Sequence, residues 1–455
     1  MTNHFIDIDR TRPVTLPDNL EDWLDKNDLA RFIVEVVEQL DISAIENAYS
    51  GRGSAAYPPK VMLALLFYCY AKQTFSSRKI ERATYESIPV LFITAGLHPD
   101  HDTINRFRKR FLLELSELFV MLLQIAHGMK IFKLGDIYID GTKIKANASK
   151  HKALSWDYAC KLEKQLKAEV ALLLERAETE NTHDNKELDI PAEVQHREKR
   201  LERIAEVKAE IEERAQERYE QEQAEYEAKI AEREAKEKAQ GRKLGGRKPK
   251  EPEAGPRSKD QVNFTDEDSR IMPESGGNFV QGYNVQATVD GDTMLIIGQH
   301  VSQNTNDKQE IEPALAELEK LPEELGEVTR AGADTGYFSK DNVDKFIEQG
   351  IEPNVASGRQ SHNERLEERL SETPEAPENP TPVEAMQHRM KTSEGKDFYA
   401  KRKSTVEPVF GIIKEAMGFR HFMLRGLEAV KGEWTLVCMA YNFKRLCVLN
   451  ASNSL

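Results

Sequence analysis

The chain has 455 residues, enough for two or three domains with a sizeable core. Its composition, 39% hydrophobic and 31% charged, is typical of a soluble protein with a strongly polar segment, and no run of about 18 apolar residues indicates a membrane span. The first residues lack a signal-peptide pattern, and the 4 scattered cysteines indicate neither disulfides nor structural zinc. We therefore expect a reduced cytoplasmic protein with no membrane partner.

The net charge of −14 argues against a nucleic-acid partner only when it is averaged over the whole chain. Glutamates are concentrated in the middle third. From Lys401 to Arg445, nine Lys and Arg residues stand against four Glu, which gives +5 for that segment. Because local charge decides phosphate contacts, the composition remains compatible with nucleic-acid binding.

Residues 1–130 predict an all-α domain. Apolar spacing predicts helices near residues 20–24, 30–40, 61–73, 76–83 and 88–95. A further amphipathic helix begins with the basic stretch His101–Phe111. Short helices that end in a basic helix resemble a helix-turn-helix, which would place Arg106 and Arg108 on DNA. A plain helical bundle with a solvated basic face is the alternative.

The next segment predicts a strand that ends in a carboxylate. Ile137 and Ile139 alternate with polar residues in the period-two pattern of a half-buried strand, and Gly141 marks a turn directly after Asp140. Such a carboxylate is well placed to hold a divalent cation, because the rigid backbone fixes the ligand and the turn leaves room for substrate. Asp136, at the other end of the strand, is a rival ligand.

Residues 151–261 predict an inserted helical hairpin with a basic arm. Two apolar stripes, at 162–177 and 194–230, run through otherwise charged sequence at spacings of three, four and seven. Two antiparallel helices would use both stripes, as a spacer or in self-association. The glycine-rich stretch that follows is either an arm that lays Arg247 and Lys248 into a minor groove or a solvated linker.

The remainder predicts strands and helices in alternation. The expected order is a hairpin over 278–301, a helix over 307–321, a strand that ends at Asp334, a helix from 339, a strand over 351–356, a helix that bears Glu407, and a last helix over 433–449. Removing the insertion leaves an α/β fold, a mixed sheet flanked by helices. Asp140 and Asp334, on adjacent central strands, would converge in this sheet, and Glu407 would join them from a helix that lies across the two strands.

Each acidic residue has a simpler explanation when it is taken alone. Asp140 and Asp334 both stand in turn sequences, and Ser404–Glu407 matches a capping box. Taken together, their order and element types favour three oxygen ligands on separate rigid elements. That set suits a pair of Mg²⁺ or Mn²⁺ ions for in-line phosphoryl transfer.

Three motifs resemble those of DDE transposases of bacterial insertion sequences. They are Tyr138–Lys143, Ala333–Tyr337, and the set Tyr399, Arg402, Glu407 and Lys414. The last set resembles the family's Tyr-Arg-Glu-Lys signature, in which Arg and Lys attend the catalytic Glu. Arg402 lies one residue further from Glu407 than in the common form, and Lys403 holds that place, so either residue is a candidate.

The resemblance covers most of the chain and implies its organisation. A helical N-terminal transposase domain at 1–130 precedes an RNase H-like catalytic domain at 131–150 and 262–455, with 151–261 inserted. Asp140, Asp334 and Glu407 would bind two Mg²⁺ or Mn²⁺ ions.

The implied reaction is cleavage at transposon ends and attack of the freed 3′-hydroxyls on target DNA. Lys414, two helical turns after Glu407, would reach a DNA phosphate. Tyr399, Arg402 and Lys403 are further DNA contacts that the resemblance implies. The implied partners are double-stranded DNA and a second copy of the chain, on the nucleoid. A catalytically inert, transposase-derived DNA-binding protein and a coiled-coil scaffold are the alternatives.

Overall fold

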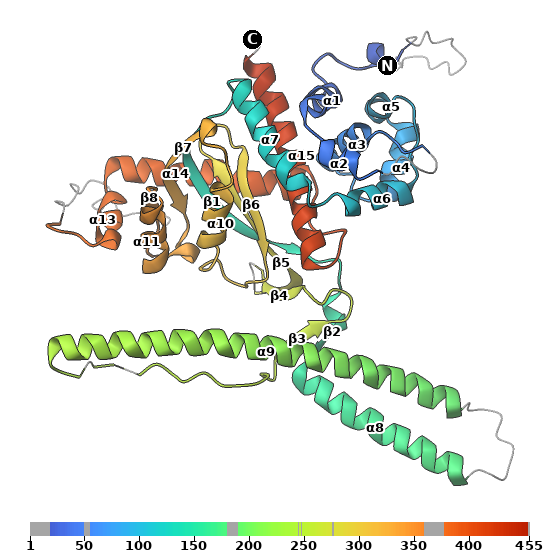
Figure 1. The fold of residues 1–455 in the computed structure, drawn as a ribbon, viewed down its shortest axis with the longest axis vertical. Helices are drawn as coiled ribbons and strands as arrows, with labels where there is room; N and C mark the ends of the chain where they lie inside the picture. Colours follow the sequence, from blue (N-terminus) through green and yellow to red (C-terminus); the bar gives the residue numbers. More distant parts are fainter. Residues whose placement is uncertain are drawn as a thin grey trace, which may run out of the picture. The chain divides into compact units, whose positions relative to one another are not determined.

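The computed structural model describes residues 19–49, 55–179, 190–243, 245–246, 248–274, 277–358 and 377–453 (Figure 1). The chain divides into two compact units. Residues 1–145 and 283–455 form the first, and residues 146–282 form the second. Arg247, one of the predicted DNA contacts, lies outside the described residues.

The N-terminal part of the first unit is helical, which confirms that prediction. Its helices are η1 (Leu20–Trp23), α1 (Leu29–Gln39), α2 (Ser43–Asn47), α3 (Pro59–Ala71), α4 (Ser77–Glu86), α5 (Ile88–Thr94), α6 (His101–Arg110) and α7 (Leu115–Gly128). Helix α3 begins with Pro59, whose missing N–H is no loss in a first turn, and it is buried against α1, α5 and α15 (Leu427–Asn453). Asp100 caps α6 through the backbone N–H of Thr103.

No single helix among the described residues is long and apolar enough to cross a membrane. Only α6 and α7 together, bent by 83°, reach the required length and composition.

The first unit contains a mixed sheet, which confirms the predicted α/β class. The strands of the whole sheet are β1 (Leu134–Lys145), β4 (Arg270–Pro273), β5 (Phe279–Asp290), β6 (Ile296–Ser302), β7 (Gly326–Ala333) and β8 (Glu352–Val355); β4 and residues 279–282 of β5 belong to the second unit. Their order is β4-β5-β1-β7-β8, and β6 pairs with β5. The pairs β1–β7 and β7–β8 are parallel, whereas β4–β5 and β5–β6 are antiparallel. Only residues 279–282 of β5, which belong to the second unit, pair with β4.

Five helices pack on this sheet. They are α10 (Ile311–Leu318) and α15 on β6, α11 (Lys340–Glu348) and α13 (Pro382–Arg389) on β8, and α14 (Ser393–Gly411) on β1 and β7. The turns between them are η3 (Glu323–Leu325), η4 (Thr335–Tyr337) and the π-helical η5 (Ile412–Ala416).

The second unit is built on two long helices, α8 (Trp156–Thr179) and α9 (Ile190–Gln240), which pack against each other (Figure 1). The turn η2 (Lys150–Lys152) precedes a two-stranded sheet of β2 (Ala153–Ser155) and β3 (Gln261–Asn263). Residues of both predicted stripes, with residues of this small sheet, form one apolar core: Leu154, Ala159, Leu166, Ile204, Val207, Ile211 and Val262.

A buried polar network joins α3, α6 and α15 within the first unit. The Glu433 carboxylate is 0% exposed, and it accepts hydrogen bonds from the Tyr70 hydroxyl at 2.8 Å and from two backbone N–H groups at 2.9 Å. The Arg108 guanidinium donates to the Tyr70 hydroxyl at 2.8 Å and to the Phe75 carbonyl at 2.9 Å. Burial raises the pKa of Glu433. Because an unpaired buried charge is costly, Arg108 has a structural task here.

We therefore expect Arg108→Ala to lower the free energy of unfolding by about 3 kcal/mol, because it removes the nearest cation from a buried carboxylate. Arg106→Ala, on the exposed side of the same helix, should change it by less than about 0.5 kcal/mol. Urea unfolding followed by circular dichroism measures both. Equal stabilities for the two variants would contradict this interpretation.

Candidate active site

Parallel pairing brings two of the predicted acidic residues to one edge of the sheet. Ile139 of β1 lies opposite Ala333 of β7, so Asp140 and Asp334 follow at matched positions. β7 ends before Asp334, as predicted, but β1 continues to Lys145, so the predicted strand end at Asp140 and turn at Gly141 are wrong. Asp140 accepts the Gly141 N–H at 2.8 Å. Asp334 accepts the Gly336 N–H at 2.7 Å and caps η4, so its turn role is real as well.

Helix α14 is anchored across this edge by an aromatic contact. The Tyr138 hydroxyl donates to the Phe398 carbonyl at 2.8 Å, and the two rings stack with centroids 5.1 Å apart. Tyr138 and Asp140 share one face of β1, and Phe398 and Arg402, four residues apart, share one face of α14. The anchor therefore sets Arg402 above Asp140.

The guanidinium of Arg402 bridges two of the three acidic residues. Its Nη1 lies 3.3 Å from Asp140 Oδ2, and its Nη2 lies 2.8 Å from Glu407 Oε1. Its Nε is buried and has no hydrogen-bond partner among the described residues. Lys403 is exposed and makes none of these contacts in the described part of the chain. The sequence left open whether Arg402 or Lys403 attends the carboxylates. In the structure, it is Arg402 that contacts Asp140 and Glu407.

The site is electrostatically unsatisfied. The pKa of Asp140 is raised to about 7, chiefly by burial; Asp334 and Glu407 contribute to the increase, whereas Arg402 and the Gly141 N–H oppose it. Desolvation therefore outweighs the single cation present. A carboxylate in this state is stabilised by additional positive charge.

The donors match divalent metal ions in type and charge, because hard cations prefer carboxylate oxygens. In their present arrangement, no three His, Cys, Asp or Glu side chains in the described part of the chain are grouped closely enough to hold an ion. Oxygen ligands lie about 2.1 Å from Mg²⁺. The Arg402 guanidinium now occupies the space between Asp140 and Glu407, so it would have to move before these carboxylates could share an ion.

Two further predicted residues lie beside this cluster. Lys414 donates to the Thr142 hydroxyl, on the strand face that also carries Asp140. It reaches that position from the π-helical η5, since α14 ends at Gly411, and not from a continuous helix as expected. The Tyr399 ring lies 5.8 Å from the Arg402 guanidinium.

Asp136, the rival ligand, is engaged elsewhere. Its carboxylate binds Arg330 through two hydrogen bonds, Nε–Oδ1 at 2.8 Å and Nη2–Oδ2 at 2.6 Å. Asp136 lies four residues before Asp140, roughly 13 Å along the strand. It is therefore excluded from the cluster in this structure.

The other predicted DNA contacts differ in exposure. Arg106 and Lys248 are exposed, whereas Arg108 is 5% exposed and bound inside the first unit. The prediction that Arg108 contacts DNA is incompatible with this position, because its guanidinium is buried and both of its Nη atoms donate to internal acceptors. A basic residue on an amphipathic helix can face either way, and sequence spacing alone did not decide between them.

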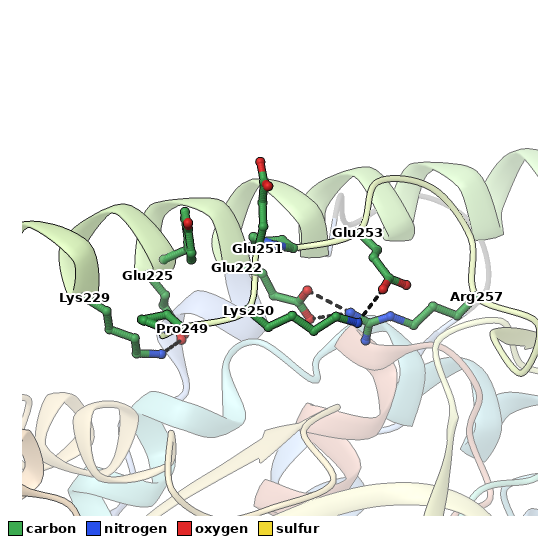
Figure 2. Close-up of a pocket in the computed structure, with 10 residues that line it drawn as sticks. Glu222, Glu225, Lys229, Pro249, Lys250, Glu251, Glu253 and Arg257 are labelled. Atoms are coloured by element: carbon green, nitrogen blue, oxygen red, sulfur yellow. Dashed lines mark hydrogen bonds and ion pairs between the residues drawn. The ribbon is translucent and has the colours of Figure 1, made fainter. Parts of the chain in front are cut away.

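The second unit has a groove of about 440 Å³ between α9 and residues 249–257 (Figure 2). Its cations are paired with glutamates: Arg257 with Glu222 at 2.8 Å, Lys229 with Glu225 at 2.9 Å, and Lys250 with Glu253. Because its positive charge is already neutralised, this groove does not favour a phosphate.

Comparison with protein families identifies the chain. The Transposase DDE domain model matches residues 254–443, and the Transposase domain (DUF772) model matches residues 18–110. Comparisons with curated proteins and with solved structures find no match. The fold and both matches define a transposase.

More specifically, the chain is a DDE transposase of the insertion-sequence type, as the motifs indicated. The DDE match includes Asp334 and Glu407 and begins after Asp140. The assignment of Asp140 therefore depends on strand pairing and its contact with Arg402.

Asp140→Asn should stabilise the metal-free protein. The folded-state pKa of Asp140 lies above the ordinary value of 3.8, so ionisation costs stability; the cost is absent below about pH 4 and complete above about pH 7. In EDTA at pH 8 we expect the variant to gain about 1–2 kcal/mol, and nothing at pH 4.

Asp136→Asn, on the same strand, is the matched control. It loses charge-assisted bonds to Arg330 and should lower stability by about 1–3 kcal/mol at pH 8. Thermal unfolding of both variants at the two pH values gives the comparison. A destabilised Asp140→Asn at pH 8 would show that the site is not electrostatically unsatisfied.

Proposed function

We propose that this transposase is catalytically active, that it cleaves DNA at transposon ends in the presence of Mg²⁺ or Mn²⁺, and that it transfers the freed 3′-hydroxyls to target DNA. The observation that carries this proposal is the placement of Asp140 and Asp334 side by side, directly after the paired residues Ile139 and Ala333 of two parallel strands, with Glu407 joined to Asp140 through Arg402. The strand order β6-β5-β1-β7-β8, with β1, β7 and β8 parallel, supports an RNase H-like catalytic domain.

In this proposal Asp140, Asp334 and Glu407 hold two divalent ions, which supply activation of the attacking oxygen and charge neutralisation at the phosphate. The protein's own residues do the remaining work. Arg402 leaves the carboxylates and binds a phosphate oxygen, for which its planar fork of donors is suited. Lys414, which donates to Thr142 two residues after Asp140, contributes a second phosphate contact.

The proposed partner is double-stranded DNA, with a second copy of the chain holding the other transposon end. Outside the cluster, Arg106 in the N-terminal helices and Lys248 in the basic arm are the exposed candidates for phosphate contacts. Arg108 is omitted because it is buried.

Asp334→Ala should abolish cleavage and spare end binding. Removing one ligand from a metal pair costs several kcal/mol of transition-state stabilisation, so we expect a loss of roughly 1,000-fold or more. The assay uses purified full-length chain, DNA that carries the element's own ends, and Mg²⁺, with mobility shift to measure binding.

Asp341→Ala, an exposed carboxylate on α11, is the control and should cut like the wild type. Undiminished cleavage by Asp334→Ala would remove Asp334 from the mechanism. A wild-type chain that binds the ends and does not cut them with any divalent ion would favour the inert DNA-binding alternative.

Arg402→Gln and Lys403→Gln form a second matched pair of adjacent residues of like charge. Arg402→Gln should lower cleavage about 100-fold, since a fork of charge-assisted hydrogen bonds is lost at the reacting phosphate. Lys403→Gln should lower it by less than about threefold. Single-turnover rates at saturating Mg²⁺ separate the two. The reverse order of effects would transfer the signature role to Lys403.

A further inference from the structure

A fourth carboxylate, Asp307, lies next to the candidate active site, between β6 and α10. Its Oδ1 accepts three hydrogen bonds, from Lys143 Nζ at 3.0 Å, Asn284 Nδ2 at 2.8 Å and Gln286 Nε2 at 3.0 Å. Lys143 belongs to β1, and the two amides belong to β5. One carboxylate oxygen therefore ties a loop to two strands of the sheet.

Gln286 carries this connection to the backbone after Asp140 and to the turn after Asp334. It is 1% exposed, and its Oε1 accepts the Tyr337 hydroxyl. Tyr337 stands in η4, the turn that Asp334 caps. A Cβ atom at Gly141 would lie 2.1 Å from Gln286 Nε2, so the amide lies directly against the backbone that follows Asp140. The same side chain thus supports the residue after Asp140 and the turn after Asp334.

The other oxygen of Asp307 faces the Asp334 turn. A Cβ atom at Gly336 would lie 2.9 Å from Asp334 Oδ1 and 3.7 Å from Asp307 Oδ2. Both carboxylates therefore flank the same glycine. A side chain at 336 would crowd the Asp334 carboxylate first, so glycine lets this carboxylate lie close to the turn.

Asp307 lies on the opposite face of β1 from the Asp140 side chain, which distinguishes it from the candidate metal ligands. Lys143 is three residues after Asp140, and side chains alternate along a strand, so Lys143 and its partner Asp307 lie on the face away from Arg402. Asp307 is paired with Lys143 and two amides there. That surrounding is typical of a residue that orients others, not of one that meets substrate.

We propose that Asp307 is a positioning residue which, acting through Gln286 and Lys143, sets the relative placement of Asp140 and Asp334. This inference rests on the proposed function of that same site. A charge-assisted hydrogen bond is roughly twice as strong as a neutral one, and Asp307 is the charged member of the network. Without Asp307, the buried Gln286 amide is left partly unsatisfied. The backbone after Asp140 and the turn after Asp334 then lose their common support.

The test measures metal affinity as well as activity. Mn²⁺ binding to the full-length chain without DNA is followed by electron paramagnetic resonance, and the Mg²⁺ concentration for half-maximal end cleavage is measured separately. Asp307→Ala should raise the Mn²⁺ dissociation constant and the Mg²⁺ requirement by about 10-fold or more, as the loss of residues behind metal ligands typically does. Cleavage at saturating Mg²⁺ should fall much less.

Asp307→Asn retains an acceptor for Asn284 and Gln286 and loses only the charge that holds Lys143, so its metal affinity should be intermediate. If Asp307→Ala fails to fold, the metal affinity of Asp307→Asn tests the positioning role instead. Glu312→Gln, which removes an exposed carboxylate paired with Lys345 on the adjoining helix, is the control and should match the wild type.

Wild-type metal affinity in both Asp307 variants would overturn the positioning role and leave the proposed function standing. A wild-type chain that fails to cleave DNA would overturn the proposed function instead. The Mn²⁺ titration would still decide the role of Asp307.

Discussion

The candidate site depends on the parallel pairing of β1 with β7. Asp140 lies within β1 and Asp334 directly follows β7, and pairing of the two strands in the register Ile139 to Ala333 is what makes these aspartates neighbours. A shift of one residue would turn one carboxylate to the other face of the sheet. The contact of Tyr138 with Phe398 then fixes α14 across the same edge and aligns Arg402 with Asp140.

The structure keeps several charged groups out of water and satisfies most of them. Glu433 is saturated by Tyr70 and two backbone N–H groups, and Asp307 by a lysine and two amides. Asp140 differs, because burial raises its pKa to about 7 even with Arg402 beside it. Locally unfavourable electrostatics of this kind are concentrated at functional sites, whereas a purely structural carboxylate is normally compensated.

Much of the fold was readable from local pattern. The alternation before Asp140, the run before Asp334 and the apolar stripes of α8 and α9 each depend on neighbours only a few residues away, and the structure has strands and helices at those places. The family resemblance was likewise carried by short motifs, which two domain matches confirm. The Asp307 network was missed. Its available signal was Asn284 and Gln286, two amides that alternate with Tyr283, Val285 and Ala287 along a predicted strand.

By itself, the sequence determined where most of the strands and helices lie and that Asp334 follows a strand, because periodicity and turn chemistry are local. It did not determine that β1 continues past Asp140 to Lys145. The tertiary structure alone decided which cation meets those carboxylates. Arg402 and Lys403 are adjacent, but successive residues of a helix point about 100° apart, so the anchoring of α14 turns only one of them toward β1. The tertiary structure also decided that Arg108 is buried and that Asp136 pairs with Arg330. The sequence could not show this, because the partners of long charged side chains come from elements remote in sequence.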